Sequence, residues 1–318
     1  MPTTTRDKPR TSVERPTMLT LTWAVRVLLA LLPIVAAPAF QNALNDASRP
    51  VQLVAAVGLW ALWFAALVAA FVPTAISLTV LRLIAPAAPV AAIAAWACGS
   101  GTSAGVAAVA TTLLATATAF TAEVGARFVQ GSAYGDERRF PLRPPASLVM
   151  IVLPVGWCLS IGLLGVGTLL AATRDRRIVG VVFALIGAVL TAGFSRRAHR
   201  LTRRFAVLVP SGFVLHDHFV LADTAMFRRS DVRSFSFAAA STEAADLAGN
   251  ALGASIEVRF ADSETVVLAG TLQKRNGTAL HMRSARFVPS RPGAFLVEAQ
   301  RRGYSAIPPA STTESVGS

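Results

Sequence analysis

The chain has 318 residues, of which 53% are hydrophobic and only 15% are charged, and its mean hydropathy is +0.55. These values exclude an ordinary soluble globular protein and indicate a polytopic membrane protein. The formal net charge of +13 would suggest nucleic-acid binding in a soluble protein, but here much of it flanks apolar segments. We therefore predict membrane lipids, and no nucleic acid, among the partners.

Residues 1–22 form a basic tail, and six membrane spans are predicted within residues 23–194. A span needs about 20 apolar residues, and breaks occur at Pro73 and in the Gly- and Ser-rich turn 99–103. The predicted spans are 23–40, 51–72, 78–98, 104–121, 147–172 and 178–194.

Basic residues near the span ends predict the orientation, because such residues stay preferentially in the cytoplasm. One cluster precedes the first span, a second lies between the fourth and fifth spans, and a third follows the sixth. An even number of spans puts all three on one side. We therefore predict a multi-pass protein of the cell membrane with both termini in the cytoplasm. The exceptions are Arg49 and the group Arg174, Arg176 and Arg177, which this topology places outside.

A cleaved signal peptide is an alternative interpretation of residues 1–39. A basic leader and an apolar run are followed there by Ala37-Pro-Ala39, a pattern typical of a cleavage site. The leader is long and Arg26 interrupts the apolar run, which favours a retained span. Cleavage would leave five spans and the same side for the C-terminal segment.

Charged and polar residues within the spans bear on transport. The six predicted spans contain no Asp or Glu, which disfavours a proton- or cation-coupled transporter. Arg26 and Arg82 are expected to lie near a cytoplasmic end and to snorkel to the headgroups. A transporter or channel subunit remains the alternative function, with the threonine-rich fourth span as its polar lining. Its threonines are Thr111, Thr112, Thr116 and Thr118.

Small residues form two candidate packing faces, Gly101 with Gly105 and Gly162 with Gly165 and Gly167. Such faces suit a homo-oligomer or packing within one bundle equally well.

The connection between the fourth and fifth spans mixes charge, glycine and proline, so a turn-rich segment on the membrane surface is expected.

Residues 195–204 are predicted to be a basic juxtamembrane linker. Each arginine near an anionic leaflet contributes on the order of 1 kcal/mol to membrane attachment. The residues predicted to contact anionic lipid are Arg196, Arg197, Arg200, Arg203 and Arg204.

From residue 205 the pattern changes to short alternating segments separated by turn residues, which indicates a mainly-β domain over 205–303. Helix 294–302 is expected to follow the strands with Ser290 as its cap, and the segment 239–252 to be a short helix or a mobile insertion. The tail 304–318 is expected to be disordered. The predicted strands are 205–209, 212–216, 219–222, 232–237, 255–260, 266–269 and a last one around 283–288, with the bend of a hairpin at 262–264.

No catalytic, cofactor or metal site is predicted. His216 and His218 bracket Asp217, but no third metal ligand has a defined spacing from them. An enzyme acting on lipid at the membrane face ranks last among the functions. Its acids would have to come from Glu123, Asp136 or Glu137, which have no known catalytic spacing.

Three segments resemble the bacterial pleckstrin-homology-like domains, namely VLVPSGFVLHD, FRRSDVRSF and FVPSRPGAFLVEAQRRG. These domains often follow a transmembrane hairpin, and PLRPP before the fifth span fits that arrangement. The resemblance covers about 140–303 and is closest to actinobacterial membrane proteins with extra N-terminal spans. It implies a small barrel with a C-terminal helix, serving as a non-enzymatic binding or scaffolding module in cell-envelope organisation. The turn 210–212 has no Lys or Arg, so phosphoinositide specificity is not implied.

Overall fold

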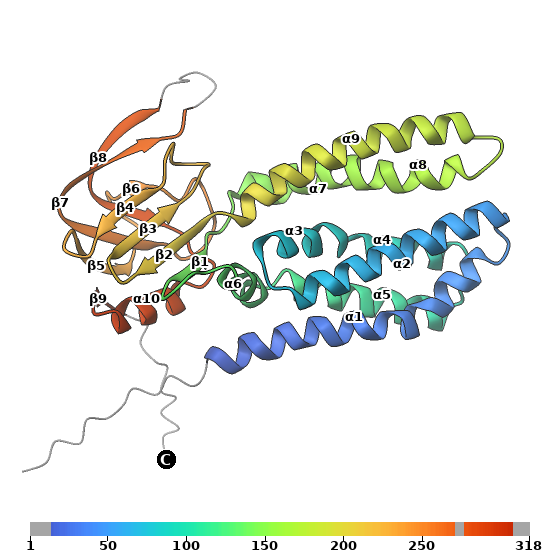
Figure 1. The fold of residues 1–318 in the computed structure, drawn as a ribbon, viewed down its shortest axis with the longest axis horizontal. Helices are drawn as coiled ribbons and strands as arrows, with labels where there is room; N and C mark the ends of the chain where they lie inside the picture. The colour runs from blue at the N-terminus through green and yellow to red at the C-terminus, as the bar shows by residue number, and fades with distance from the viewer. Residues whose placement is uncertain (1–13, 271–276, 308–318) are drawn as a thin grey trace, which may run out of the picture.

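The computed structural model describes residues 14–270 and 277–307 and consists of a helical bundle followed by a mainly-β domain (Figure 1). Within these residues, six helical segments are long and apolar enough to cross a membrane. They agree with the six predicted spans. The segments are Leu19–Leu44, Arg49–Phe71, Ala75–Ala97, Thr102–Ala119, Leu148–Ala171 and Arg177–Thr202.

The first four spans are built from five helices, because the third span is interrupted at Pro86. A proline there lacks the N–H that a continuous helix would need. The helices are α1 (Glu14–Leu44), α2 (Arg49–Phe71), α3 (Ala75–Ile84), α4 (Ala87–Ala97) and α5 (Thr102–Ala119).

The last two spans form a helical hairpin. The fifth comprises η1 (Leu148–Val152), α7 (Leu153–Trp157), η2 (Cys158–Gly162) and α8 (Leu163–Ala171), and the sixth is α9 (Arg177–Thr202). The π-helical turn η1 ends two residues before Pro154, a residue that cannot donate a backbone hydrogen bond to the preceding turn.

The spans expose large apolar side chains, which is typical of a surface that faces lipid rather than water. Examples from three helices are Ile34, Leu53 and Ile178, which are 73%, 66% and 82% exposed. Small residues fill one part of the bundle interior, among them Ala39, Ala92 and Ala108, and large side chains such as Leu78 and Leu81 fill another.

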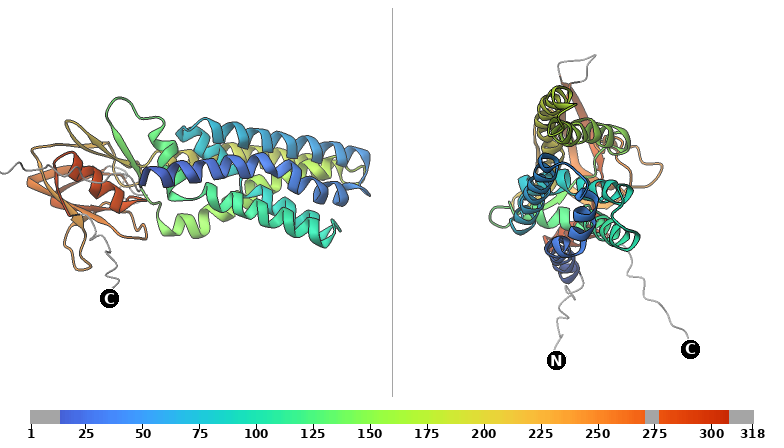
Figure 2. Two further views of the ribbon diagram at one scale, coloured as in Figure 1. Left: turned by 90° about the horizontal axis from the view of Figure 1, so that it is seen from below. Right: turned by 90° about the vertical axis from the view of Figure 1, so that its right-hand side faces the viewer.

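The β-domain caps one end of the bundle (Figure 2). The start of α1, the end of α5 and the end of α9 lie at this end, whereas the α1–α2, α4–α5 and α8–α9 connections lie at the opposite end (Figure 1). The basic residues before the fifth span and after the sixth therefore lie on one side of the bundle, as the even number of spans requires.

The connection between the fourth and fifth spans was expected to be turn-rich, and it contains two regular elements instead. Helix α6 (Ala122–Gln130) buries Val124, Phe128 and Val129 on one face. Strand β1 (Arg138–Pro141) pairs antiparallel with β2 (Phe205–Val209). The bundle therefore contributes an edge strand to the β-domain.

The β-domain contains two sheets. One has the antiparallel order β1-β2-β3-β4, and the other has the order β6-β8-β7-β5-β9, in which β6 pairs parallel with β8 and β9 parallel with β5. Neither sheet is closed into a barrel over the described residues, so the expected barrel is not observed. The remaining strands are β3 (Gly212–His216), β4 (Ala225–Arg228), β5 (Val232–Phe237), β6 (Ala245–Asp246), β7 (Ile256–Leu268), β8 (Thr278–Phe287) and β9 (Ser305–Ala306).

An aromatic core joins the two sheets to the C-terminal helix α10 (Pro292–Arg301). Phe295 on α10 is fully buried, with its ring 5.1 Å from Phe140 of β1 and 5.3 Å from Phe287 of β8. Phe213 of β3 and Phe235 of β5 complete the contact. The predicted apolar-faced helix is therefore present and closes the domain.

Several predictions for this domain are wrong. The hairpin with its bend at 262–264 does not exist, because β7 continues to Leu268 as one strand that pairs with β8 across a register shift between Arg259 and Glu264. Residues 219–222 form a turn in which only Leu221 makes an isolated bridge, to Leu268.

Three further expectations also need correction. Segment 239–252 contains β6 and buries Leu247 rather than forming a helix. The N-cap of α10 is Arg291, so Ser290 does not cap it. The disordered tail was predicted to start at residue 304, but Tyr304 is buried and β9 joins a sheet. The rest of that tail, 308–318, lies outside the described residues, as does 1–13.

Candidate membrane-surface site

The basic segment 195–204 is the end of a helix rather than a linker. Helix α9 has 26 residues, about 39 Å at 1.5 Å per residue, which exceeds a hydrocarbon core of about 30 Å. Its apolar part ends at Phe194, and the helix continues to Thr202. The last two turns of α9 therefore project toward the headgroup region on the side of the β-domain.

Three arginines of this segment share one face of the helix end. Arg196, Arg200 and Arg203 are spaced four and three residues apart, which stacks them along one stripe, while Arg197 lies to the side. All four are exposed, and among the described residues none of them forms an ion pair. We refer to Arg196, Arg197, Arg200 and Arg203 as the arginine face. Its geometry suits phosphate groups.

Arg204 does not belong to this face, which corrects the prediction that it contacts lipid. Its side chain is only 1% exposed. Its Nε donates to Asp217 Oδ1 at 2.7 Å and its Nη2 to Asp217 Oδ2 at 2.6 Å, while Nη1 donates to the carbonyl of Arg143 at 3.2 Å. The guanidinium is therefore occupied within the protein.

The pairing of strands β2 and β3 places these two residues together. Phe205 and His216 are opposite each other in the antiparallel register, so Arg204 and Asp217 flank the same end of the hairpin. The amide of Phe219 also donates to Asp217 Oδ1 at 3.0 Å. A bidentate, fully buried pair with further hydrogen bonds satisfies both charges. It connects the end of α9, the first β-hairpin and the segment after β1.

A second set of contacts joins α9 to the bundle at the same level. The hydroxyl of Thr79 on α3 lies 3.0 Å from Nδ1 of His199 and 3.1 Å from the hydroxyl of Thr202. The hydroxyl of Thr202 also donates to the carbonyl of His199 at 2.8 Å. His199 is therefore a packing residue between two helices.

The two arginines within spans make internal contacts. Arg26 Nε donates to the carbonyl of Ala70 at 3.1 Å, and its guanidinium lies over the rings of Trp23 and Phe71. Arg26 lies in the half of α1 nearer the β-domain, and a backbone carbonyl of α2 takes up its Nε donor.

Arg82 points between α5 and α6 rather than toward headgroups. It donates to the carbonyls of Ala119 at 3.3 Å and Thr121 at 3.2 Å. Gly125 makes room for it, since a Cβ there would lie 2.9 Å from Arg82 Nη2. Arg82 therefore fastens the turn between α5 and α6.

The threonine-rich fourth span offers few free hydroxyls for a transport route. Thr111, Thr112 and Thr118 each donate to a carbonyl one turn earlier at 2.6–2.8 Å. Thr116 bonds to the carbonyls of Thr112 and Ala85. These hydroxyls satisfy the backbone, which weakens the transporter interpretation.

The acids considered for an enzyme are paired with arginines. Glu123 lies 3.7 Å from Arg291, and Asp136 lies 3.1 Å from Arg302 of the C-terminal segment. Glu137 pairs with Arg139 on the strand beside it. The first two pairs connect the loop between the fourth and fifth spans to α10 and its C-terminal end, so these carboxylates have a structural role.

The histidine pair near the junction makes ring and hydrogen-bond contacts within the β-domain. The rings of His216 and His218 lie 4.2 Å apart, and His216 Nδ1 lies 2.7 Å from the hydroxyl of Thr224. The part of the chain that the structure describes holds no group of three potential metal ligands. Burial, then the charges of His218, Arg203 and Arg139, lowers the pKa of His216, opposed by Asp217.

The small-residue faces divide between internal contacts and open surface. Gly105 packs on Trp96, and Gly167 packs on the backbone of α9 at Ala184. Gly101, Gly162 and Gly165 have no atom within 4 Å of the Cβ position. The first two contacts are internal, and homo-oligomerisation stays a prediction.

Comparison with protein-family models, with curated proteins and with solved structures gives no match to this chain. The function therefore has to be inferred from its own residues. Sequence reasoning missed strand β1 and the pairing of Asp217 with Arg204. The signal for Asp217 was that it directly follows one strand while Arg204 directly precedes its partner.

Proposed function

We propose that this protein is a non-enzymatic integral membrane protein that displays a pleckstrin-homology-like binding or scaffolding module at the cytoplasmic face, in cell-envelope organisation. The bundle anchors the module, and the arginine face binds anionic headgroups of the inner leaflet. Arg204 is left out of this lipid contact because Asp217 binds it. The resemblance of three segments to bacterial modules of this kind supports the assignment of the domain.

The observation that carries the proposal is the contribution of the bundle to the domain. Strand β1 lies between the fourth and fifth spans and pairs with β2 after the sixth. Arg291 and Arg302 form ion pairs with residues of the same loop. A domain held at several points has a defined orientation, which a module that presents a binding surface requires and a flexibly tethered one lacks.

The surface for a partner is the outer edge of β4, on which the amide of Arg228 donates to Asp231 Oδ2 at 3.2 Å. This strand ends the four-stranded sheet, and Met226 on it is 60% exposed. An unpaired strand edge can accept an extended segment of another protein by backbone hydrogen bonding. We therefore infer a protein partner that adds a strand at β4.

Site-specific photo-crosslinking in intact cells tests this function. A photoreactive amino acid replacing Met226 is expected to give a discrete protein adduct, and one replacing Asp175, at the opposite end of the bundle, is expected to give none. If Met226 gives no discrete adduct, or the same one as Asp175, the strand-edge proposal is contradicted.

The orientation requires its own experiment. In a background with Cys98→Ala and Cys158→Ala, a membrane-impermeant maleimide should label Asp175→Cys in intact cells and Ser230→Cys only after lysis. Both positions are exposed, so a difference in labelling reports the side of the membrane. The reverse pattern would place the β-domain outside and contradict the proposal.

A further inference from the structure

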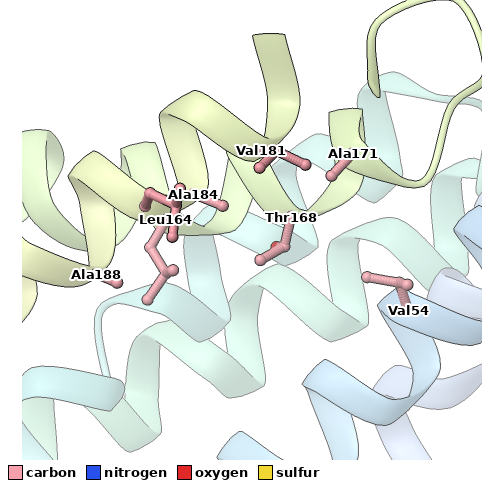
Figure 3. Close-up of a pocket in the computed structure, with 8 residues that line it drawn as sticks. Val54, Leu164, Thr168, Ala171, Val181, Ala184 and Ala188 are labelled. Carbon is pink, nitrogen blue, oxygen red and sulfur yellow. The ribbon is translucent and has the colours of Figure 1, made fainter. Parts of the chain in front are cut away.

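An apolar groove lies between α2 and the α8–α9 hairpin (Figure 3). Its volume is about 460 Å³ and it is open along one side. Thr168 is the one polar residue of its lining, and its hydroxyl already donates to the carbonyl of Gly165 at 2.8 Å. The groove thus offers hydrocarbon contacts only. Its lining residues are Val54, Leu164, Thr168, Ala171, Val181, Ala184, Leu185 and Ala188.

The groove lies beside a closely packed hairpin that is hydrogen-bonded to the bundle nearer the β-domain. Helices α8 and α9 meet at backbone contact, since a Cβ on Gly180 would lie 2.1 Å from the amide nitrogen of Ala171. Side-chain hydrogen bonds join hairpin and bundle toward the β-domain, where Trp157 Nε1 donates to the carbonyl of Leu83 at 2.8 Å and the hydroxyl of Thr79 lies 3.0 Å from His199 Nδ1. At the end of the bundle remote from the β-domain, the groove lies between the hairpin and α2.

The depth of the groove corresponds to one leaflet. Ala188 follows Arg177 by eleven positions in α9, which is about 16 Å along the helix. Half of a hydrocarbon core of about 30 Å is about 15 Å. The groove therefore runs from the membrane surface remote from the β-domain to about the centre of the bilayer.

Four exposed arginines lie at the starts of α2 and α9 and in the α8–α9 connection, next to the helices that line this groove, and we refer to them as the distal arginines. Arg174 follows the lining residue Ala171 by three positions, and Arg177 precedes Val181 by one turn. Among the described residues none of the four forms an ion pair, although Asp46 and Asp175 lie in the same loops. The set comprises Arg49, Arg174, Arg176 and Arg177.

We propose that this groove binds one acyl chain of an anionic phospholipid of the leaflet remote from the β-domain, whose phosphate is held by the distal arginines. Guanidinium groups bind phosphate with paired hydrogen bonds, and the apolar lining excludes any polar occupant. The proposal accounts for the arginines that oppose the positive-inside pattern. A second copy of the chain would need no such charge at the mouth of the groove.

Native mass spectrometry of the detergent-solubilised full chain, titrated with phosphatidylglycerol or phosphatidylcholine, tests the proposal. The unchanged protein is expected to retain one phosphatidylglycerol through partial delipidation. Ala188→Phe fills the groove and should lose that lipid, while Ala61→Phe, an exposed alanine of α2 outside the lining, should keep it. The triple variant Arg174→Gln, Arg176→Gln, Arg177→Gln should bind phosphatidylglycerol at least tenfold more weakly and lose the preference over phosphatidylcholine.

A photoactivatable phosphatidylglycerol with its reactive group on the acyl chain supplies a second measurement that needs no substitution. Adducts are expected on the peptides that contain Leu164 and Leu185. Retention of the lipid by Ala188→Phe, or adducts spread evenly over the lipid-facing helices, would overturn the proposal. If Ala188→Phe converts a dimer to a monomer without changing lipid retention, the groove holds a second copy and the lipid site is refuted.

Discussion

Arg203 and Arg204 are neighbours in sequence and have opposite environments. Arg203 is exposed on the arginine face, whereas Arg204 is buried against Asp217. The run of arginines predicts surface charge at every position, and only the place of Arg204 directly before β2 distinguishes the two. The difference arises from the pairing of β2 with β3, which brings a carboxylate thirteen residues away into contact.

Removing Asp217 is expected to destabilise the β-domain strongly. Asp217→Asn leaves the guanidinium of Arg204 buried without its counter-charge, and the loss of one member of a buried pair costs about 3–5 kcal/mol. The thermal unfolding midpoint of the purified protein should fall, whereas Asp223→Asn at an exposed position should change the unfolding free energy by less than about 0.5 kcal/mol.

The double variant Arg204→Leu, Asp217→Leu tests whether the loss of stability comes from the unpaired buried charge. It should recover a large part of the loss, since two apolar residues leave no unpaired charge. Equal stability of Asp217→Asn and the unchanged protein would show that the pair does not connect the segments as described.

His216 is expected to make stability depend on pH. Burial and nearby positive charges lower its pKa below 6.5, so the unfolded state binds the proton more tightly than the folded state does. Stability therefore falls as the pH falls through about 6.5. Between pH 7.5 and 5.5, His216→Gln should lose less thermal stability than the unchanged protein, and His281→Gln, at an exposed position, should behave like the unchanged protein. Identical pH profiles for all three would refute the assignment.

At the scale of single elements, the α8–α9 hairpin depends on glycine at its contact points. A Cβ on Gly180 would approach backbone atoms of Ala171 and Leu170 to 2.1 and 2.5 Å, whereas Gly193 on the same helix has nothing within 4 Å. Gly180→Ala should lower the free energy of unfolding in detergent by about 1–3 kcal/mol, the usual cost of overpacking. Gly193→Ala is the matched control and should be neutral. Equal effects of the two would contradict the packing.

The end of α9 is expected to select anionic lipid. Replacing Arg196, Arg197, Arg200 and Arg203 with glutamine removes charges worth about 1 kcal/mol each near an anionic leaflet. Electron spin resonance of spin-labelled lipids should show a reduced association of phosphatidylglycerol relative to phosphatidylcholine. Arg204→Gln should destabilise the fold and leave this selectivity unchanged, which distinguishes the exposed from the buried arginines. Unchanged selectivity in the fourfold variant would contradict the proposed lipid contact.

The elements differ in how far the sequence predicts them. The six spans follow from length and hydrophobicity alone, because a segment in lipid must satisfy its own backbone hydrogen bonds. The bend predicted at 262–264 was wrong because polar residues also occur in an exposed register shift, where β7 continues to Leu268. The alternation of polar and apolar residues indicates a strand, and polar clusters indicate turns. This pattern does not show where one strand ends and its partner strand begins.

At the scale of the whole molecule, the two-part organisation is predictable and its connection is not. Strand β1 was missed because its pairing with β2 spans more than sixty residues and because prolines surround it. The ion pairs of Glu123 and Asp136 were likewise not predictable, because their partners, Arg291 and Arg302, lie far away in sequence on either side of α10. These long-range contacts make the bundle and the β-domain a joined structure rather than an anchor with a tethered module.

The distance between the bundle and the β-domain tests this central claim most directly. Spin labels at Ile76→Cys, at the start of α3, and at Ser230→Cys, in the turn before β5, are both exposed. Double electron–electron resonance in nanodiscs, in the Cys98→Ala, Cys158→Ala background, should give one narrow distance distribution. A broad distribution extending over tens of ångströms would show that the domain moves freely on a linker, and would contradict the fixed presentation proposed for it.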